Sequence, residues 1–473
     1  ANTDNIYNVV GFLDDNPGKI GKSIEGIPVY DPTVISPQFI KKRNIHELII
    51  AVHNIDPVKK REFADAFLQF NVTIKNIPPV ENWINGELQL RQIKAIRIED
   101  LLMREPIILD NNIVLKQNKD KVILVTGAAG SIGSEISRQL MHCHAKRIIL
   151  LDQAETPLHD LYLNLKNTFA DFSDRAEIFM ADISNTQRME WVFNHYKPQL
   201  VYHAAAYKHV PMMEESPVEA VRVNIFGTRI LADAAIRHGA EKFVMISTDK
   251  AVKATNVMGA TKRIAEMYIQ SLDIHQPNTT RFITTRFGNV LGSNGSVIPL
   301  FQKQIEEGGP ITVTHPEITR FFMTIPEACQ LVLEAGAMGQ GSEIFMFDMG
   351  KSIRIVDLAR NMIRLSGLQP EKDIKIIYTG LRPGEKLYEE LLNSSENTLP
   401  THHPRIMIAQ VNPTDHQLLI QQLDDLTLQW QSYDNFKIVA ALKKIVPDYR
   451  SNNSVYEQLD SSTPVSINPK SAD

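Results

Sequence analysis

The stretch that most constrains the fold is a strand, a glycine-rich turn and a helix in direct succession within residues 121–140. Residues 122–125 are aliphatic without interruption, as expected of a strand buried on both faces of a parallel sheet. Gly127, Gly130 and Gly133 follow at the spacing G-x-x-G-x-x-G. Missing Cβ atoms permit the turn, the approach of a pyrophosphate to the backbone and close helix packing. The free N–H groups at the start of the helix attract an anion.

A carboxylate follows where a bound dinucleotide would need one. The apolar strand at 147–151 ends in Asp152, about twenty residues after the last glycine, where an acidic side chain accepts hydrogen bonds from ribose hydroxyls. A carboxylate there repels a 2′-phosphate, so the sequence predicts NAD as the cofactor rather than NADP. The predicted contacts in the turn are Gly127, Gly130, Ser131, Ile132 and Gly133.

Composition indicates an ordinary globular chain. Its 473 residues suggest two or three domains, and 43% hydrophobic with 22% charged residues is typical of soluble proteins. The net charge of −5 and the scattered basic residues lack the basic footprint of a nucleic-acid binder, so no nucleic-acid partner is expected. The two cysteines cannot form a disulfide framework, which fits a reducing compartment.

Two further classes are disfavoured by local patterns. No window approaches eighteen uninterrupted apolar residues, and the first residues lack the regions of a signal peptide, so the chain as given is expected to be soluble and cytoplasmic. His142, Cys143 and His144 invite a metal site, but successive helical residues point about 100° apart and cannot converge on one ion. No metal is expected there.

The alternation of apolar strands and helical segments predicts an α/β fold. Strands are expected at 177–180, 200–203, 243–247 and 282–286, with helices between them. Right-handed crossovers then give a Rossmann-type doubly wound parallel sheet covered on both faces.

The remaining chain divides by composition and periodicity. A smaller N-terminal unit is expected to be half of a doubly wound domain, with strands at 8–13, 47–52 and 72–77 and a helix at 57–70. The expected divisions are 1–85 for this partial N-terminal domain, 86–120 for a connector, 121–395 for the NAD-binding and catalytic domain with substrate-capping parts from about 290, 396–450 for a helical region and 451–473 for a disordered tail.

Three stretches extend the cofactor prediction. Asp182 and Ile183 lie just beyond a strand, where the carboxylate can reach the adenine amino group. Ala204 and Ala205 end the next sheet strand with side chains small enough to admit a nicotinamide, and Asn224 lies in the following helix. Each residue alone has an equally good structural explanation; their order and spacing support one another.

With these residues the sequence resembles the extended short-chain dehydrogenase/reductase superfamily. That superfamily carries Ser/Thr followed by Tyr-x-x-x-Lys, and here the frame reads Thr248 and then Met258-Gly-Ala-Thr-Lys262. The resemblance implies that Lys262 hydrogen-bonds the nicotinamide ribose. Met258 replaces the tyrosine and has no proton to exchange. One interpretation is that Met258 only packs and the enzyme is inactive.

The Asp249-Lys250 pair indicates one group within this superfamily. With Asn-Val-Met-Gly-Ala-Thr-Lys after it, the pair is similar to the large membrane-anchored bacterial 4,6-dehydratases that act on UDP-N-acetylglucosamine in polysaccharide and protein-glycan synthesis, some of which carry methionine at the tyrosine position. The resemblance implies hydride transfer from C4 to C6 with loss of water, with Lys250 as the C5 base and Asp249 as the C6 acid. Thr248, Asp249 or a water chain through Lys262 would take the C4 hydroxyl proton.

A lysine base must be partly neutral, which burial or the positive charge of a neighbouring cofactor would favour. The plain alternative is that Asp249 and Lys250 form a surface ion pair.

The resemblance also implies contacts with a UDP-sugar. Arginines would bind the diphosphate, because the guanidinium fork suits phosphate oxygens. A carboxylate would bind the ribose hydroxyls. The implied substrate residues are Lys208, Asn289, Ser293, Arg320, Arg382 and Glu385.

Other expectations follow from the same family. Full-length relatives are anchored at the cytoplasmic face of the inner membrane, so the chain is expected to be a soluble fragment that begins inside its first domain, and a homo-oligomer. Two rival functions remain. A UDP-sugar 4-epimerase would need a tyrosine where Met258 stands, and a catalytically silent NAD-dependent sensor or scaffold would account for Met258 directly.

Overall fold

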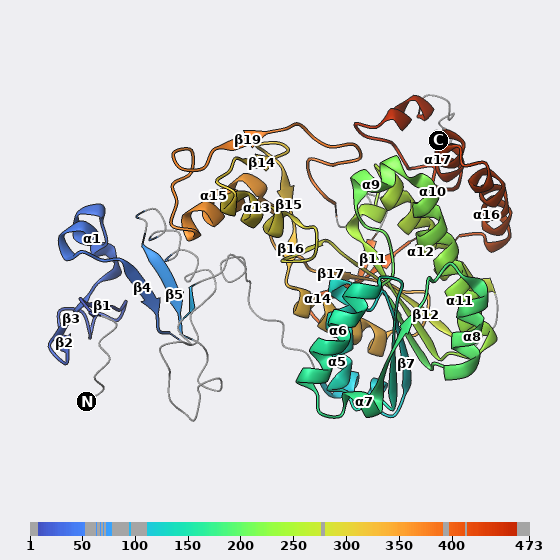
Figure 1. Cartoon of the computed structure of the whole chain (residues 1–473), viewed down its shortest axis with the longest axis horizontal. Coiled ribbons are helices and arrows are strands. Elements are labelled where there is room, and N and C mark those ends of the chain that lie inside the picture. Colours follow the sequence, from blue (N-terminus) through green and yellow to red (C-terminus); the bar gives the residue numbers. More distant parts are fainter. Residues whose placement is uncertain are drawn as a thin grey trace, which may run out of the picture. The chain divides into compact units, whose positions relative to one another are not determined.

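The computed structural model describes residues 8–52, 63, 67, 70, 72–77, 94–95, 111–275, 280–390, 397–411 and 414–460. Three predicted segments lie largely or wholly outside these residues: the helix at 57–70, most of the connector, and residues 461–473 of the tail. The chain forms two compact units (Figure 1). The larger comprises 106–300, 312–356 and 378–473, and the smaller comprises 1–105, 301–311 and 357–377.

The larger unit is built on one nine-stranded sheet. Its strands are β7 (Val122–Thr126), β8 (Arg147–Asp152), β9 (Ala176–Met180), β10 (Leu200–His203), β11 (Lys242–Thr248), β12 (Arg281–Phe287), β17 (Ile344–Phe347), β20 (Asn397–Pro400) and β21 (Ile406–Gln410). They lie in the order β20-β21-β17-β12-β11-β10-β7-β8-β9. The seven strands from β9 to β17 are parallel, and β21 and β20 are added antiparallel at one edge. This confirms the predicted doubly wound fold.

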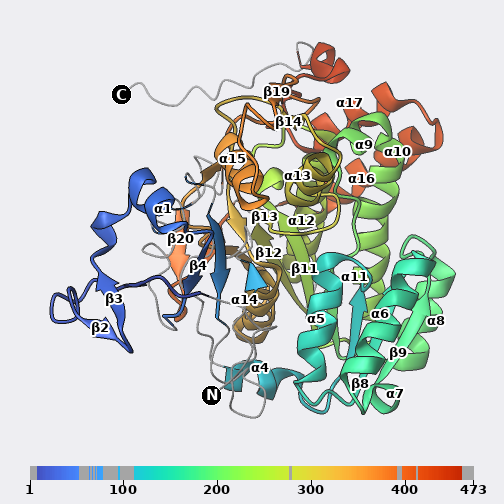
Figure 2. The same ribbon diagram turned by 60° about the vertical axis from the view of Figure 1, so that its left-hand side comes forward.

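Helices cover both faces of the sheet (Figures 1 and 2). Because side chains of a strand alternate between faces, Leu124 joins one core while Ile123 and Val125 join the other. One face carries α4 (Asn111–Asn118), α5 (Ser131–Met141), α6 (Glu155–Thr168), α7 (Phe172–Arg175) and α14 (Ile325–Met338). The other carries α8 (Thr186–Tyr196), α11 (Thr228–Arg237), α12 (Val257–His275), α16 (His416–Gln431) and α17 (Asn435–Ile445).

Short elements follow the carboxyl ends of the sheet strands. After β10 come α9 (Val210–Glu215), α10 (Pro217–Ala220) and the π-helix η4 (Val221–Gly227), and after β11 comes the single turn η5 (Asp249–Ala251). Beyond β12, β13 (Asn289–Val290) pairs in parallel with β16 (Phe322–Met323), and β15 (Thr319–Arg320) pairs antiparallel with β18 (Ile353–Arg354). These two ladders lie in the region where capping parts are predicted.

Two predicted boundaries are corrected by tertiary contacts. Helix α4, predicted as connector, belongs to the large unit, because Val114 is in its core and Tyr202 Oη donates a hydrogen bond to Asn118 Oδ1 at 2.9 Å. The prediction of disorder from Ser451 is wrong for residues 451–460, which include the turn η6 (Val455–Leu459). Tyr456 there is buried, and its hydroxyl donates to the Glu214 carbonyl at 3.0 Å.

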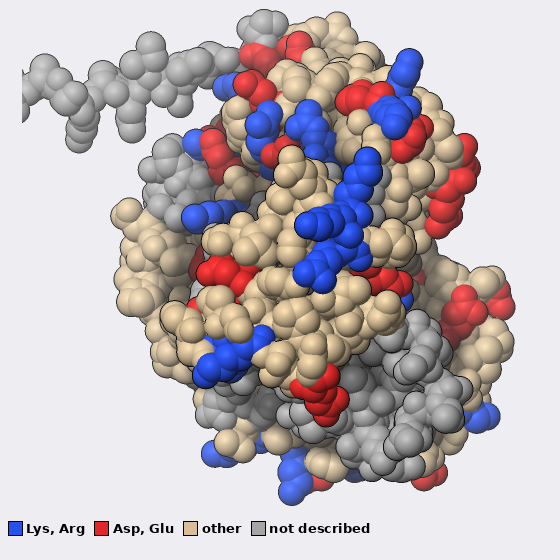
Figure 3. All heavy atoms as spheres, turned by 90° about the vertical axis from the view of Figure 1, so that its left-hand side faces the viewer, with Lys and Arg blue, Asp and Glu red and all other residues tan. Residues whose placement is uncertain are grey.

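The smaller unit is an additional N-terminal α/β region. It contains β1 (Phe12–Leu13), β2 (Ser23–Ile24), β3 (Ile27–Tyr30), η1 (Pro32–Val34), α1 (Pro37–Arg43), β4 (Glu47–Ile50), β5 (Thr73–Asn76) and β6 (Lys94–Ala95). Strands β1 and β3 are parallel, as are β4 and β5. Ser36 caps α1 by accepting a hydrogen bond from the Phe39 N–H at 3.2 Å. On the face shown in Figure 3, basic and acidic side chains are interspersed among uncharged ones.

The boundary between the units falls within α13 (Val297–Glu306), β14 (Ile311–Val313), α15 (Ile355–Leu365) and β19 (Ile376–Tyr378). Within the described part of the chain, no helix combines the length and the apolar character that spanning a bilayer requires.

Candidate functional site

The turn between β7 and α5 requires its glycines for close approach. Gly127 has a φ of +66°, and a Cβ there would lie 2.5 Å from the Ala205 backbone nitrogen. A Cβ on Gly133 would lie 2.0 Å from the Gly127 carbonyl oxygen. Gly130 is the N-cap of α5 and has no side chain with which to cap the first turn, so the N–H groups there suit an anion.

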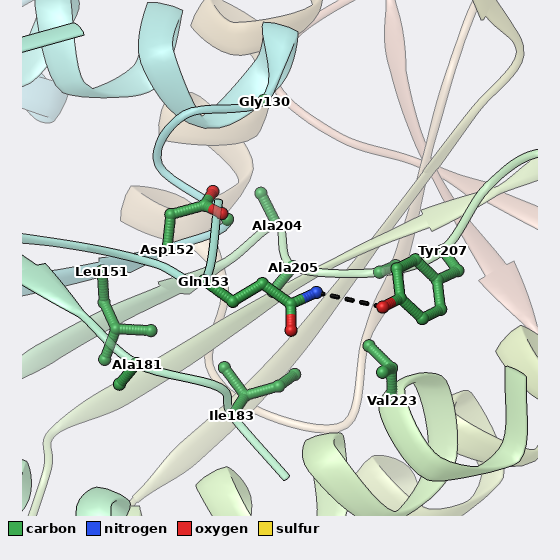
Figure 4. Close-up of a pocket in the computed structure, with 12 residues that line it drawn as sticks. Gly130, Leu151, Asp152, Gln153, Ala181, Ile183, Ala204, Ala205, Tyr207 and Val223 are labelled. Atoms are coloured by element: carbon green, nitrogen blue, oxygen red, sulfur yellow. Dashed lines mark hydrogen bonds between the residues drawn. The ribbon is translucent and has the colours of Figure 1, made fainter. Parts of the chain in front are cut away.

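A pocket opens beside this turn at the carboxyl ends of β7, β8 and β10 (Figure 4). Open α/β sheets bind ligands at this point, where the strand order reverses between β7 and β10. Its lining is Gly127, Gly130, Leu151, Asp152, Gln153, Ala181, Ile183, Ala204, Ala205, Ala206, Tyr207 and Val223. Six predicted cofactor residues are among them. Sequence reasoning missed Gln153 as a contact, whose Nε2 donates to Tyr207 Oη at 3.2 Å across the pocket wall.

The Asp152 carboxylate is held in this pocket by the backbone. Its Oδ2 accepts from the Ala129 N–H at 3.0 Å and its Oδ1 accepts from the Ala154 N–H at 2.9 Å. These contacts tie the carboxylate to the glycine-rich turn, and it lines the pocket where a ribose is predicted. The helix start, the small alanine wall and this carboxylate together fit a dinucleotide, and Gly127, Gly130, Asp152, Ala204 and Ala205 are the residues that would hold it.

Two predicted cofactor residues support the wall instead. The Asn224 side chain accepts from the Tyr207 N–H at 2.9 Å and donates to the Tyr207 carbonyl at 3.1 Å and to Thr261 Oγ1 at 3.1 Å. Two of these hydrogen bonds therefore hold the loop that carries Tyr207, and the third joins Asn224 to α12. Asp182 forms an ion pair with Arg222. Burial raises its pKa, but hydrogen bonds from Ser184 and Arg222 outweigh this and hold the pKa of Asp182 below its usual range.

Predicted acid and base lie side by side where β11 ends. Asp249 is 1% exposed, and its Oδ1 accepts from Thr248 Oγ1 at 2.9 Å and from Lys250 Nζ at 3.0 Å. Its Oδ2 is buried with no hydrogen-bond partner among the described residues. A Cβ on Gly288 would lie 2.9 Å from that oxygen, so the glycine leaves room beside it. The alternative of a surface ion pair is therefore wrong.

Burial sets the charge of this pair. Desolvation raises the pKa of Asp249 above its usual range, which is the direction that suits an acid. Burial lowers the pKa of Lys250, but the carboxylates of Asp249 and Glu389 outweigh burial and hold it above its usual range. The expectation that burial makes Lys250 partly neutral is thus corrected: without ligands, this amine is an ammonium.

Glu389 is a residue of this site that sequence reasoning missed. Its side chain is 3% exposed, and Oε1 lies 3.4 Å from Lys250 Nζ and 3.6 Å from Arg320 Nε. Burial raises the pKa of Glu389, but the positive charges of Lys250 and Arg320 outweigh burial and hold this pKa below its usual range. The carboxylate is therefore ionised. The acidic cluster at 385–390 was the only signal, and it does not say which carboxylate is buried.

Met258 and Lys262 lie one turn apart on α12. Met258 is 3% exposed and belongs to the hydrophobic core. Burial lowers the pKa of Lys262 to about 8. Its Nζ has no hydrogen bond or ion pair within the described part of the chain, as suits an amine that binds a ligand hydroxyl.

The predicted substrate residues are brought together only in part. Arg320 is buried and occupied: Nη2 donates to Glu385 Oε1 at 3.2 Å and Nη1 to the Thr319 carbonyl at 2.8 Å. Glu385 Oε2 in turn accepts from the Arg382 N–H at 3.0 Å, while the Arg382 side chain is exposed.

The other three substrate residues lie on neighbouring loops. Asn289 Oδ1 is 3.5 Å from Lys250 Nζ, so Asn289 lies beside the predicted acid and base. Lys208 Nζ donates to the Asn294 carbonyl at 2.9 Å. The Ser293 hydroxyl donates to the Val290 carbonyl at 3.1 Å and is buried within its own loop.

Comparisons with known proteins agree with this architecture. Residues 123–411 match the model of a family described as polysaccharide biosynthesis protein. The capsular polysaccharide biosynthesis protein CapD of Staphylococcus aureus is 49% identical over 385 residues, which cover 81% of this chain and 64% of CapD. The chain thus spans less than two thirds of that relative.

Solved structures share the fold. Pen from Bacillus thuringiensis is 32% identical with a TM-score of 0.57, covering 65% of this chain and 99% of Pen. DesIV, the dTDP-glucose 4,6-dehydratase of Streptomyces venezuelae, was solved with NAD and DAU bound. It is 19% identical with a TM-score of 0.51, covering 66% of this chain and 99% of DesIV. This is a likeness of fold alone. From the family match and the nine-stranded sheet with its glycine-rich turn, the chain belongs to the polysaccharide biosynthesis protein family, built on the extended short-chain dehydrogenase/reductase fold.

Proposed function

We propose that this chain carries the active site of an NAD-dependent UDP-N-acetylglucosamine 4,6-dehydratase. Its product would be a UDP-4-keto-6-deoxy-N-acetylhexosamine. Membership of the polysaccharide biosynthesis family and the identity to CapD support a nucleotide sugar as the substrate class.

The observation that carries the proposal is the Asp249–Lys250 pair. Elimination of water needs an acid and a base that act on neighbouring carbons of the substrate. Here the buried Asp249 carboxyl lies 3.0 Å from the Lys250 amine. The carboxyl has one oxygen without a protein partner among the described residues, and burial raises its pKa. A 4-epimerase has no need of such a pair.

The chain's own residues then have distinct tasks. NAD held by Gly127, Gly130 and Asp152 would supply a hydride acceptor for C4 and then a hydride donor for C6. Thr248, Asp249 or a water chain through Lys262 would take the C4 hydroxyl proton. Asp249, protonated through Oδ2, would donate to the departing C6 hydroxyl, and Lys250 would remove the C5 proton once the C4 ketone has made that proton acidic. Before that step Lys250 must lose its own proton, because the carboxylates around it favour the ammonium.

Three neighbouring residues would support these steps. Thr248 donates to Asp249 Oδ1 and so leaves Oδ2 as the oxygen that faces the substrate. Lys262, with a pKa lowered to about 8, would hold the nicotinamide ribose. Asn289 would hold the sugar beside Lys250.

The test is incubation of the purified protein with UDP-N-acetylglucosamine, followed by mass spectrometry. A product lighter by one water is expected, and it should be missing with Asp249→Asn. An isomer of unchanged mass would indicate the epimerase, and unaltered substrate would indicate the sensor or scaffold; either result overturns the proposal.

A further inference from the structure

Glu389 is a buried residue to which the family resemblance gives no role. It comes from the loop after Arg382-Pro-Gly-Glu385, which has no helix or strand at 381–390. Although the neighbouring Tyr388 and Glu390 are exposed, the Glu389 side chain is buried, at 3% exposure. A carboxylate on an irregular loop has no packing reason to be buried, so its burial depends on the charges that it meets.

The charges that face Glu389 come from three elements. Lys250 of η5 lies 3.4 Å away and Arg320 of β15 lies 3.6 Å away, both at Oε1. Asp249 and Lys386 also interact electrostatically with Lys250. Lys386 turns aside, since its Nζ donates to the Val252 carbonyl at 3.1 Å.

The geometry leaves one part of Glu389 unused. Its Oε2 is buried and has no hydrogen-bond partner among the described residues, in the same cluster as Asp249 Oδ2. Burying a carboxylate oxygen without a partner is unfavourable, so a purely structural ion pair would be expected to satisfy both oxygens. Asp249 Oδ2 is likewise buried without a hydrogen-bond partner in the described part of the chain.

We propose that Glu389 is a positioning residue for the acid–base pair: its carboxylate ties the Lys250 amine to Arg320 and so fixes that amine beside the Asp249 carboxyl. This inference rests on the proposed function for the task of Lys250. Since Arg320 also binds Glu385 at 3.2 Å, two carboxylates of one loop lock that loop to β15.

The arrangement has a consequence for charge. Because Glu389 lies within contact distance of Lys250, its charge stabilises the ammonium; a neighbouring opposite charge typically shifts a pKa by about 1–3 units. Removing the charge while keeping the shape should increase the neutral fraction of Lys250 at a given pH. The misplaced amine would nevertheless turn over substrate more slowly, since small misplacements cost on the order of 10²-fold.

The test measures Lys250 directly in the free, full chain. At pH 8.5 the protein is treated with a small acylating reagent, and acylation of Lys250 is followed by peptide mass spectrometry relative to Lys303, a lysine with a 72% exposed side chain. Glu389→Gln should acylate at Lys250 about tenfold faster than the wild type, because one pKa unit changes the neutral fraction tenfold. Glu389→Asp, which keeps the charge, should stay near the wild-type rate.

Glu390→Gln is the matched control. Glu390 is the next residue, its side chain is 47% exposed, and it pairs with Lys253 at 3.2 Å instead of Lys250. This variant should acylate like the wild type. Equal rates for Glu389→Gln and the wild type would overturn the proposal. Equally fast acylation in Glu389→Gln and Glu389→Asp would also overturn it, since loosening of the loop would then explain both.

Turnover gives the second readout. With UDP-N-acetylglucosamine, Glu389→Gln should lose on the order of 10²-fold in kcat while thermal unfolding and cofactor content stay as in the wild type. If the wild-type protein does not eliminate water from the substrate, the proposed function is wrong. The acylation rates would still decide whether Glu389 controls Lys250. A wild type that turns over, with unaltered Lys250 acylation in Glu389→Gln, would overturn the role of Glu389 alone.

Discussion

The Arg286 guanidinium at the end of β12 holds both carboxylate oxygens of Glu266 on α12, with Nε 2.8 Å from Oε1 and Nη2 2.7 Å from Oε2. Both side chains are buried, at 2% and 0% exposure. Glu266 lies one turn after Lys262, so this ion pair fixes the helix that presents the predicted ribose-binding amine.

Glu266→Gln should destabilise the protein strongly. Removing one partner leaves the Arg286 charge buried and uncompensated, which typically costs about 3–5 kcal/mol. Urea unfolding measures the change. Glu307→Gln, which breaks an exposed pair with Lys303 at 3.7 Å, should cost only about 0–1 kcal/mol. Similar losses for the two variants would contradict the special role of the buried pair.

The same pair predicts how stability depends on pH. Burial raises the pKa of Glu266, but the Arg286 guanidinium outweighs it and lowers that pKa to about 2, from an ordinary 4.5. A carboxyl with a depressed folded-state pKa stabilises the fold above its unfolded pKa. The contribution should therefore be complete above about pH 4.5 and decline as the pH falls towards 2. In Glu266→Gln this part of the acid dependence should be missing from urea unfolding measured at successive pH values.

Asp249 and Lys250 should be separable from cofactor binding. Asp249→Asn and Lys250→Met remove the acid and the base, and each should reduce water loss by on the order of 10²- to 10⁴-fold while the NAD content of the purified protein is retained. Lys253→Met is the control, because its amine pairs with Glu390 at the surface. Near-native turnover in both site variants would require a different mechanism.

Met258 should matter for packing more than for chemistry. It lies in the hydrophobic core at 3% exposure, so Met258→Ala should cost about 2–5 kcal/mol, measured by thermal unfolding. Met258→Leu conserves the volume and should cost less than about 1.5 kcal/mol, with turnover retained. Loss of turnover in a well-folded Met258→Leu variant would show that the thioether has a task beyond filling space.

Asp152 should select NAD. The residue lines the pocket with its carboxylate fixed by two backbone N–H groups, and Gln153 and Ala154 follow instead of an arginine that could bind a 2′-phosphate. Chromatography of the cofactor released on denaturation should identify NAD. Recovery of NADP would refute this assignment.

The sheet and its glycine-rich turn were predictable because their signals are local. The predicted strands agree with β7 to β12 to within one residue at each end, since buried parallel strands are continuous apolar runs. Asp249 and Lys250 were predictable for the same reason: they are adjacent, and they directly follow one of these strands.

Side-chain roles that depend on distant segments were not predictable. Asn224 reads as a cofactor contact, but its amide is used up by Tyr207 and Thr261. The polar composition after Ser451 suggests disorder, yet Ser454 and Tyr456 are held by Glu214, far away in the chain. The sequence does not show these partners because it records no contact between remote residues.

The sequence by itself therefore determined the doubly wound fold and its glycine-rich turn, and it indicated Asp249 and Lys250 as the proposed acid and base. Only the tertiary structure decided which groups surround these two side chains and shift their pKa values. Whether a buried lysine is neutral depends on the carboxylates that surround it, and Glu389 reaches Lys250 only after the chain has folded. Periodicity and motifs are properties of neighbouring residues, whereas the electrostatic free energy of a buried group is set by everything that packs around it.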